Sequence, residues 1–420
     1  MNKPHYLLYC LSLLAALFIF ETEIVHAQNS TSSPYSMYGL GELRSQTNAR
    51  NAGLGNAGIA LSSNSFLNTL NPASYQGIDS LNFILEMGVD GKYSNFKSQG
   101  KSANLSDANF SYLAMGWRIN QWIAAGIGVN PFSSTGYEIN TTALVDGIPA
   151  EYPLSISGSG DISRAYASVS LVPVKNLALG VKTSFLFGSL NQTQYHNLTY
   201  IGSNAISNET TDYFHNFYWE FGLQYTFQVK SNTLTLGAIY NPGQSLVTER
   251  ENSTYNSAGA IFENTTESKD DFVIPEEFGV GLAFNNNKNL LYVLDAGLQK
   301  WSDYSYDLSG VKLKNNPYVR TGIEYTPTTN FLADFYKRVN YRLGFQYAKS
   351  YLDLRNNQLD ETSISLGFGL PIRNQRSRVD VSFEAGQKGT TTNRLIKENF
   401  FRVRVGFSLR DLWFQHRQFN

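Results

Sequence analysis

The chain has 420 residues, a formal net charge of −1 and a single cysteine. A nearly neutral chain lacks the basic surface that binds nucleic acid, so we expect no nucleic-acid partner. Aromatic residues make up 14% of the chain, and a mean hydropathy of −0.27 argues against a bundle of apolar membrane helices. Both values fit a membrane β-barrel, in which aromatic girdles flank the lipid belt and only alternate residues meet lipid.

The N-terminus has the parts of a secretory signal peptide. Lys3 and His5 form a short polar start, and an apolar run from Tyr6 to Phe20 follows. That run is shorter than the roughly 20 residues of a spanning helix. Ala27 is the small residue at the expected cleavage point, so we predict that residues 1–27 are removed. The only cysteine would leave with them, which excludes disulfides, a lipidated cysteine and thiolate metal sites in the mature chain.

Residues 28–79 are rich in Gly, Asn and Ser and lack the alternation of a strand. Two interpretations compete: a disordered periplasmic tail, and a plug that folds back inside a barrel. Six apolar residues would be unusual in a tail; they are Ile59, Ala60, Leu61, Phe66, Leu67 and Leu70. We therefore predict that residues 28–79 form an N-terminal plug, called the hatch below.

Residues 53–58 read Gly-Leu-Gly-Asn-Ala-Gly and match the pattern of dinucleotide-binding loops. Such a loop needs a parallel strand before it and a helix after it, and the flanking residues fit neither. We expect no nucleotide and no other cofactor. The glycines are better explained by tight turns and close backbone packing within the hatch.

Residues 80–420 contain short segments in which apolar and polar residues alternate, a pattern that predicts β-strands. Near the C-terminus, for example, Val403 lies between Arg402 and Arg404. We predict an all-β fold, a transmembrane antiparallel β-barrel of about 14 strands. The strands should start near Leu81, Ala108, Trp122, Asp161, Leu177, Tyr213, Thr233, Val273, Leu290, Tyr318, Val339, Thr362, Arg378 and Phe400.

The connections between these strands alternate in length, as expected for short periplasmic turns and long outer loops. Short connections are predicted at residues 120–121, 173–176, 230–232, 285–289 and 371–377, and long polar ones at 92–107, 132–160, 189–212, 243–272 and 303–316. The connection 327–337 is of medium length and breaks the alternation. Its residues 330–336 are expected to form a helical turn.

Eight charged residues fall on the polar phase of their predicted strands. They are Lys182, Arg320, Glu324, Arg342, Asp380, Glu384, Arg402 and Arg404. An Arg or Lys on the lipid face near the midplane costs about 2–4 kcal/mol, so we expect these side chains to face the lumen. There they would pair across strands, with Arg402 and Arg404 meeting Asp380 and Glu384, or contact the hatch. A second interpretation uses the same arginines to hold a carboxylate ligand.

The residue pattern gives little support to catalysis, and we expect no enzymatic activity. The mature chain would hold three histidines, His196, His215 and His416, with no serine or carboxylate at a readable spacing. They match no metal-ligand motif either, so we expect no catalytic residue and no metal site. The acidic run at residues 263–271 could bind calcium, although a solvated loop explains it more simply.

Four stretches carry a family resemblance. They are residues 33–41, residues 52–61 with 68–73, residues 274–281 with 301–304, and residues 412–414 before a basic end. Together they span nearly the whole mature chain, and they resemble the FadL-type outer-membrane transport family, which includes TodX-like proteins, in its branch from Bacteroidetes-like bacteria. Asn71-Pro72-Ala73 matches the Asn-Pro-Ala motif of the hatch in that family.

The resemblance implies a barrel of 14 strands in the outer membrane of a Gram-negative bacterium, with a hatch in its lumen. It also implies passive uptake of small hydrophobic compounds, such as long-chain fatty acids or aromatic hydrocarbons. Asn71, Pro72 and Ala73 become candidates for gating. Because Pro72 biases Asn71 toward extended backbone, a plain structural turn is an equally good explanation.

Two functions from different classes remain open. The first is a transporter for small hydrophobic compounds, which should contain an apolar pocket in the outer half of the barrel. The second is a non-transporting scaffold or shuttle for protein secretion or surface attachment, which could have a polar interior and an apolar patch on its loops. The expected partners are outer-membrane lipid, a hydrophobic small-molecule ligand and, for the scaffold, a protein at the cell surface or in the periplasm.

Overall fold

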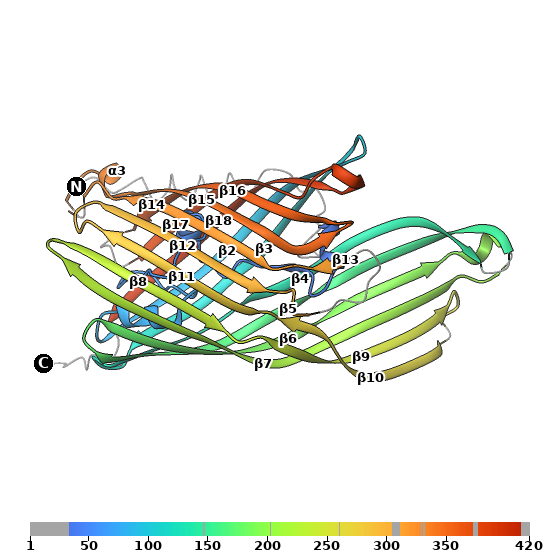
Figure 1. Ribbon diagram of the computed structural model, residues 1–420, viewed down its shortest axis with the longest axis horizontal. Helices are drawn as coiled ribbons and strands as arrows, with labels where there is room; N and C mark the ends of the chain where they lie inside the picture. Colours follow the sequence, from blue (N-terminus) through green and yellow to red (C-terminus); the bar gives the residue numbers. More distant parts are fainter. Residues whose placement is uncertain are drawn as a thin grey trace, which may run out of the picture.

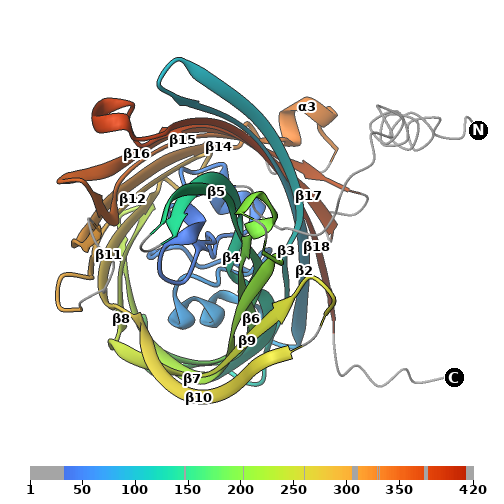
Figure 2. The same ribbon diagram turned by 90° about the vertical axis from the view of Figure 1, so that its right-hand side faces the viewer.

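The structure is a computed structural model that describes residues 33–145, 148–201, 203–259, 261–304, 311–328, 330, 332–372 and 377–412. The predicted signal peptide, His416 and residues 413–414 lie outside the described residues. Within them, fourteen antiparallel strands form a closed barrel around the hatch (Figure 1, Figure 2). The predicted fold class, an all-β barrel with a plug, is confirmed.

Each of these strands pairs with its neighbours in chain order, and two of them are interrupted. The strands are β2 (Asn82–Ser98), β3 (Lys101–Arg118), β4 (Ile123–Val145), β5 (Ile148–Val174), β6 (Leu177–His196), β7 (Ile206–Val229), β8 (Asn232–Asn241) continued by β9 (Gln244–Asn256), β10 (Ile261–Ile274) continued by β11 (Glu276–Asn285), β12 (Leu290–Lys300), β14 (Asn316–Tyr325), β15 (Asn340–Leu354), β16 (Asn357–Pro371), β17 (Ser377–Lys388) and β18 (Lys397–Leu412). Pro242 and Pro275 lie at the two interruptions, where a residue without an N–H breaks the ladder.

The first and last strands close the barrel. β18 pairs with β2 from Lys397 opposite Lys97 to Leu412 opposite Asn82. A short strand, β13 (Val311–Leu313), adds to the outer end of β15. The helical turn predicted at 330–336 is found slightly later, as α3 (Phe335–Arg338). Two 3₁₀ turns, η3 (Leu198–Ile201) and η5 (Thr392–Arg394), lie in outer connections.

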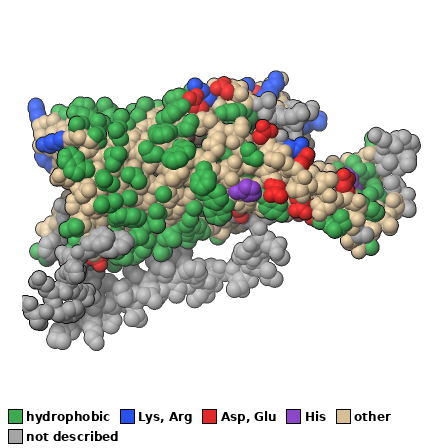
Figure 3. Space-filling view, turned by 90° about the horizontal axis from the view of Figure 1, so that it is seen from below, with side chains coloured by type: hydrophobic (Ala, Val, Ile, Leu, Met, Phe, Trp, Pro, Cys, Tyr) green, Lys and Arg blue, Asp and Glu red, His purple; other side chains and the backbone are tan. Residues whose placement is uncertain are grey.

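The outer surface of the barrel carries a belt of apolar side chains, which is visible in Figure 3. It arises because successive side chains of a strand point to opposite faces, so every second residue meets lipid. Exposed members include Val89, Ile127, Val169, Val181, Phe217, Val280, Leu294, Ile323, Leu343, Ile364 and Val405. Such a belt on a closed barrel identifies an outer-membrane protein. No helix among the described residues is long and apolar enough to cross a membrane.

The long connections differ from their prediction as polar loops, because most of their residues extend the strands. β4 reaches Val145 and β5 begins at Ile148, although residues 132–160 were expected to be loop. The same holds for β6 with β7 and for β9 with β10. In an antiparallel hairpin the ladder satisfies the backbone groups whatever the side chains are, so these polar strands need no apolar face. They project well beyond one end of the barrel (Figure 1).

The hatch fills the lumen with short elements and irregular backbone. These elements are η1 (Pro34–Met37), β1 (Glu42–Leu43), α2 (Ala49–Ala52) and η2 (Pro72–Gly77). Ile59, Ala60, Leu61, Phe66 and Leu67 are buried, and only Leu70 of the predicted apolar set is partly exposed. The plug was therefore the correct choice over the tail, since these side chains leave water inside the barrel.

Candidate functional site

The glycine run of the hatch makes direct backbone contact with the barrel wall. Gly55 has φ +68°, and a Cβ there would lie 2.5 Å from the carbonyl oxygen of Phe345. A Cβ on Gly344 of β15 would lie 1.9 Å from the backbone nitrogen of Gly55. No other residue fits either position. Residues 53–58, which match the pattern of dinucleotide-binding loops, thus pack the hatch against the barrel wall.

The start of η2 packs against β6, β7 and β8 through Asn71, Pro72 and Ala73. The Asn71 side chain is fully buried; its Nδ2 donates to the carbonyl of Ile59 at 2.7 Å, and its Oδ1 accepts from the N–H of Ala73 at 3.0 Å. Gly180 and Gly222 leave the space for these residues, because a Cβ on either would lie within 2.2 Å of the tripeptide. These contacts anchor the hatch, and gating by the three residues remains a prediction.

A buried ionic cluster joins the hatch to β14, β15 and β17. Arg50 of α2 donates to both carboxylate oxygens of Glu324, at 3.0 and 2.8 Å. Arg342 lies 2.6 Å from Glu324 and 2.6 Å from Asp380. Arg378 reaches the second oxygen of Asp380 at 2.9 Å. Two carboxylates are thus shared by three arginines, and each guanidinium group is held in place.

A second buried cluster links the hatch to β5, β6 and β7. Glu220 pairs with Lys182 at 2.9 Å and with Arg164 at 3.3 Å. Lys182 also donates to the carbonyl of Thr69, and Arg164 donates to the amide oxygen of Gln46 at 2.8 Å. Both cations therefore hold the barrel wall and the hatch at once.

The remaining predicted charges lie on β14, β17 and β18. Arg402 pairs with Glu384 at 3.2 Å, whereas Arg404 donates to the carbonyl and hydroxyl oxygens of Thr47 in the hatch. Arg320 lies over the ring of Tyr318, 4.2 Å from its centroid. The structure therefore places Arg404 against the hatch and not beside Asp380.

Several lumen-facing charges were missed by sequence reasoning. Six examples on strands are Glu86, Lys92, Arg164, Glu220, Asp295 and Glu398, all buried. Asp295, for example, accepts the N–H groups of Gly58 and Ile59 at 2.6 and 3.0 Å. All six share the polar phase of their strands, so the criterion that selected the other eight could have found them. Arg50 and Glu42 lie in the hatch, where there is no alternation of apolar and polar residues that would mark a side chain as facing the lumen.

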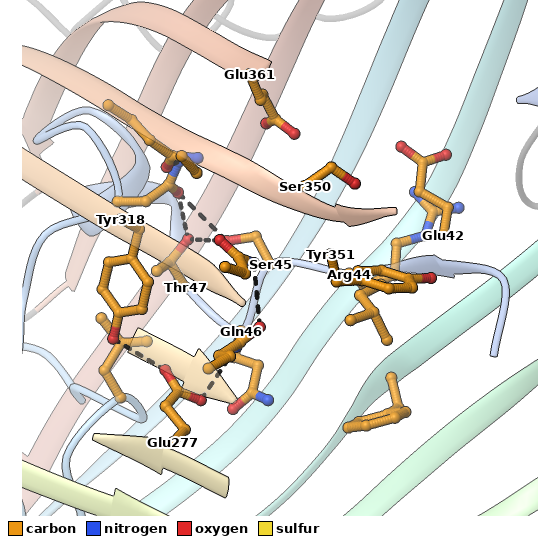
Figure 4. Close-up of a pocket in the computed structure, with 18 of the residues that line it drawn as sticks. Glu42, Arg44, Ser45, Gln46, Thr47, Glu277, Tyr318, Ser350, Tyr351 and Glu361 are labelled. Carbon is orange, nitrogen blue, oxygen red and sulfur yellow. Dashed lines mark hydrogen bonds between the residues drawn. The ribbon is translucent and has the colours of Figure 1, made fainter. Parts of the chain in front are cut away.

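A pocket of about 260 Å³ lies between the start of the hatch and the barrel wall (Figure 4). Glu42, Arg44, Ser45, Gln46 and Thr47 line it from the hatch, and Glu277, Tyr318, Ser350, Tyr351 and Glu361 line it from the wall. Tyr318 donates to Glu277 at 2.9 Å, and Thr47 donates to Asn56 at 2.6 Å.

The pocket lining is mixed and not purely apolar. Its six acidic side chains are balanced by six basic ones: Glu42, Asp90, Glu220, Glu277, Glu361 and Glu384 against Arg44, Arg320, Lys349, Lys388, Arg402 and Arg404. Apolar walls come from Leu43, Phe132 and the stacked pair Trp301 and Tyr351, whose ring centroids lie 4.2 Å apart. Such a lining suits a molecule with both a polar and an apolar part.

The barrel wall is interrupted beside this pocket, between β3 and β4. Their ladder runs only from Leu113 opposite Val129 to Arg118 opposite Ala124. Farther out, β3 pairs with β2 alone, and Ser111 forms a bulge opposite the step from Gly88 to Val89. A bulge of this kind bends its strand and changes the direction in which the strand continues.

Beyond the interruption, β4 turns to the hatch. Pro131 has no N–H to give a neighbour, and Ser133 and Ser134 pair with β1 and are fully buried. The pocket is lined by Phe110 and Ser111 on one side of the interruption and by Pro131 and Phe132 on the other. The pocket therefore extends to the place where the wall ladder is missing.

The two described histidines and the acidic run considered in the sequence all lie on barrel strands. The hydroxyl of Tyr152 lies 3.1 Å from Nδ1 of His196, and His215 points outward on β7. No three His, Cys, Asp or Glu side chains of the described residues gather as metal ligands. The acidic run at 263–271 belongs to strand β10, and the exposed side chains of residues 263–268 point alternately to its two faces.

Comparisons with known proteins agree with this architecture. A family model described as BamG matches residues 11–420. The toluene transporter TodX of Pseudomonas putida superposes with a TM-score of 0.60 at 16% identity, covering 89% of this chain and 99% of TodX. A FadL homologue of Pseudomonas aeruginosa gives 0.60 at 14% identity, with 87% and 98% covered.

A third solved structure, the monoaromatic hydrocarbon channel CymD, gives a TM-score of 0.56 at 14% identity and covers 89% of this chain and 98% of its own. No curated protein sequence matches the chain. The three likenesses show that the chain has the FadL-type fold, as its sequence motifs predicted. Its assignment to a Bacteroidetes-like branch remains a prediction.

Proposed function

Because the chain belongs to the BamG family and has the FadL-type barrel fold, we propose that it passively takes up small hydrophobic compounds through the outer membrane. Long-chain fatty acids, or amphiphiles like them, are the proposed substrates. The observation that carries the proposal is the pocket that extends to the interruption between β3 and β4. A compound could enter from the outer end and leave sideways into the bilayer without passing through the hatch.

The mixed lining supports an amphiphile as the substrate. The rings of Phe132, Trp301 and Tyr351 would contact an acyl chain, while the balanced charges would surround a polar head group. Two of the three solved relatives are named for toluene and monoaromatic hydrocarbons, which have no such head group. We accordingly propose a different substrate for this chain, and we propose that it carries out no catalysis.

The test is uptake of labelled palmitate by intact cells of a Gram-negative host that lacks its own fatty-acid channel. The wild-type chain should raise the uptake rate, and Ser111→Trp should lower it at least tenfold, because the indole would fill the pocket where it meets the wall. Ser106→Trp is the matched control, since Ser106 is exposed on the same strand. Uptake no faster than in cells without the chain would overturn the proposal.

A scaffold remains the second candidate, and a specific observation favours it. Six strands, β4 to β7 with β9 and β10, continue beyond the barrel as an open sheet (Figure 1). A channel needs no such projection, whereas a surface for a protein partner does. If a host strain that lacks the chain has a growth defect, and Ser111→Trp abolishes palmitate uptake but still corrects that defect, the scaffold is the better description.

A further inference from the structure

Strand β10 has a ladder partner on only one side. It pairs with β9 from Ile261 opposite Tyr255 to Ile274 opposite Gln244. On the other side, pairing starts only in β11, with Glu276 opposite Lys300. No described residue pairs with the outer edge of β10, and its backbone N–H and C=O groups there are open to a further strand.

This edge is long, regular and exposed. Residues 261–268 are exposed on both faces of the strand. The ladder with β9 is unbroken from Glu263 to Lys269, because its two irregularities lie at the tip and at the base. Native proteins usually block such an edge with lysines, a proline or a bulge, and this stretch has a single lysine. The edge is therefore suited to accept a strand.

The sheet around this edge is acidic, as Figure 3 shows beyond the apolar belt. β9 and β10 carry five described acidic side chains against two basic ones; they are Glu249, Glu251, Glu263, Glu267 and Asp270 against Arg250 and Lys269. Both cations are already paired, Arg250 with Asp212 at 2.7 Å and Lys269 with Glu267 at 3.2 Å. The remaining carboxylates favour a basic strand.

Two other occupants fit poorly. Lipid phosphates would meet like charge. A second copy would bring an equally acidic edge, and its geometry is also wrong. Two barrels in one membrane are related by an axis along the membrane normal, so strands tilted about 35–45° from it cannot lie antiparallel.

We propose that the outer edge of β10 accepts an extended, basic segment of another cell-surface protein as an additional strand. Backbone hydrogen bonds would supply affinity, and the carboxylates would select the sequence. This interaction does not depend on palmitate uptake, because β10 lies far from the interruption between β3 and β4 in the order of strands.

The test is site-specific photo-crosslinking from Asn264, Thr266 and Ser268, one at a time, in the full chain in intact cells of its natural host. The cross-linked residues are then identified by mass spectrometry. Each shift of two residues on β10 should move the contact by two residues on one partner segment that is rich in Lys and Arg. The same crosslinker at Asn287, in the opposite turn, should not label this segment.

The charge requirement is tested separately. Glu263→Lys with Glu267→Lys should lower the crosslinking yield from Thr266 at least tenfold, whereas Glu138→Lys with Glu151→Lys, exposed on β4 and β5, should not. Crosslinks to lipid, to a second copy or to scattered positions would overturn the proposal. So would the absence of crosslinks, or a yield that ignores the charge reversal.

Discussion

Arg50 shows how a single side chain ties the hatch to the wall. Its guanidinium group holds both oxygens of Glu324 and lies 3.7 Å from the ring centroid of Phe66. The two side chains of the ion pair are only 8% and 10% exposed. Because the ion pair is buried away from water, it adds little to the free energy of unfolding. Removing one partner, however, leaves an uncompensated buried charge, which destabilises the protein strongly.

Replacing Glu324 with Leu should therefore loosen the hatch more than replacing Arg50 with Leu. E324L leaves Arg50 buried without its carboxylate, at a cost of about 3–5 kcal/mol. R50L is milder, because Glu324 keeps Arg342 at 2.6 Å. Hydrogen exchange of hatch amides in the detergent-solubilised protein measures the difference. The double variant should recover part of the loss, and equal exchange in the two single variants would contradict this account.

At the scale of elements, barrel strands were predictable where one face meets lipid. β18 alternates because its even-numbered arginines face inward while Phe401 and Val405 face lipid. Strand β10 was not predictable, since Glu263 to Ser268 meet water on both faces and leave no period to read. The hatch shows no alternation of apolar and polar residues either. Its apolar residues therefore predicted that the segment is buried, but not that Arg50 and Asn56 contact the wall or that a pocket forms there.

The hatch as an element can be tethered to test whether it must move. The amide of Asn56 donates to Gln346 of β15 at 2.9 Å. Because this hydrogen bond lies at the ends of two long side chains, the variant Asn56→Cys with Gln346→Cys is joined by a short thiol-specific crosslinker and not by a direct disulfide. The only native cysteine lies in the predicted signal peptide. Palmitate uptake should persist after crosslinking, because the proposed route bypasses the hatch. Uptake that is lost on crosslinking but retained in the unmodified double variant would instead require hatch movement.

At the scale of the whole molecule, the barrel is a polar cylinder closed by its own N-terminal segment. Removing residues 33–79 should expose lumen charges such as Arg342, Asp380 and Glu220 to water and open an ion-conducting pore. Single-channel recording in planar bilayers should then show a conductance at least tenfold above that of the full chain. An unchanged conductance would mean that the emptied barrel collapses.

The position of the hatch before β2 has a consequence for biogenesis. The hatch is translated before the barrel, yet its contacts extend from β2, which follows it directly, to β18, the last strand to be made. The seam between β2 and β18 joins residues at least 300 positions apart, from Lys397 opposite Lys97 onward, a closure with a large entropic cost. A hatch that already contacts the strands on both sides of the seam would lower the entropic cost of bringing β2 and β18 together. It would have to be enclosed before the seam zips, because no later entrance of its size remains.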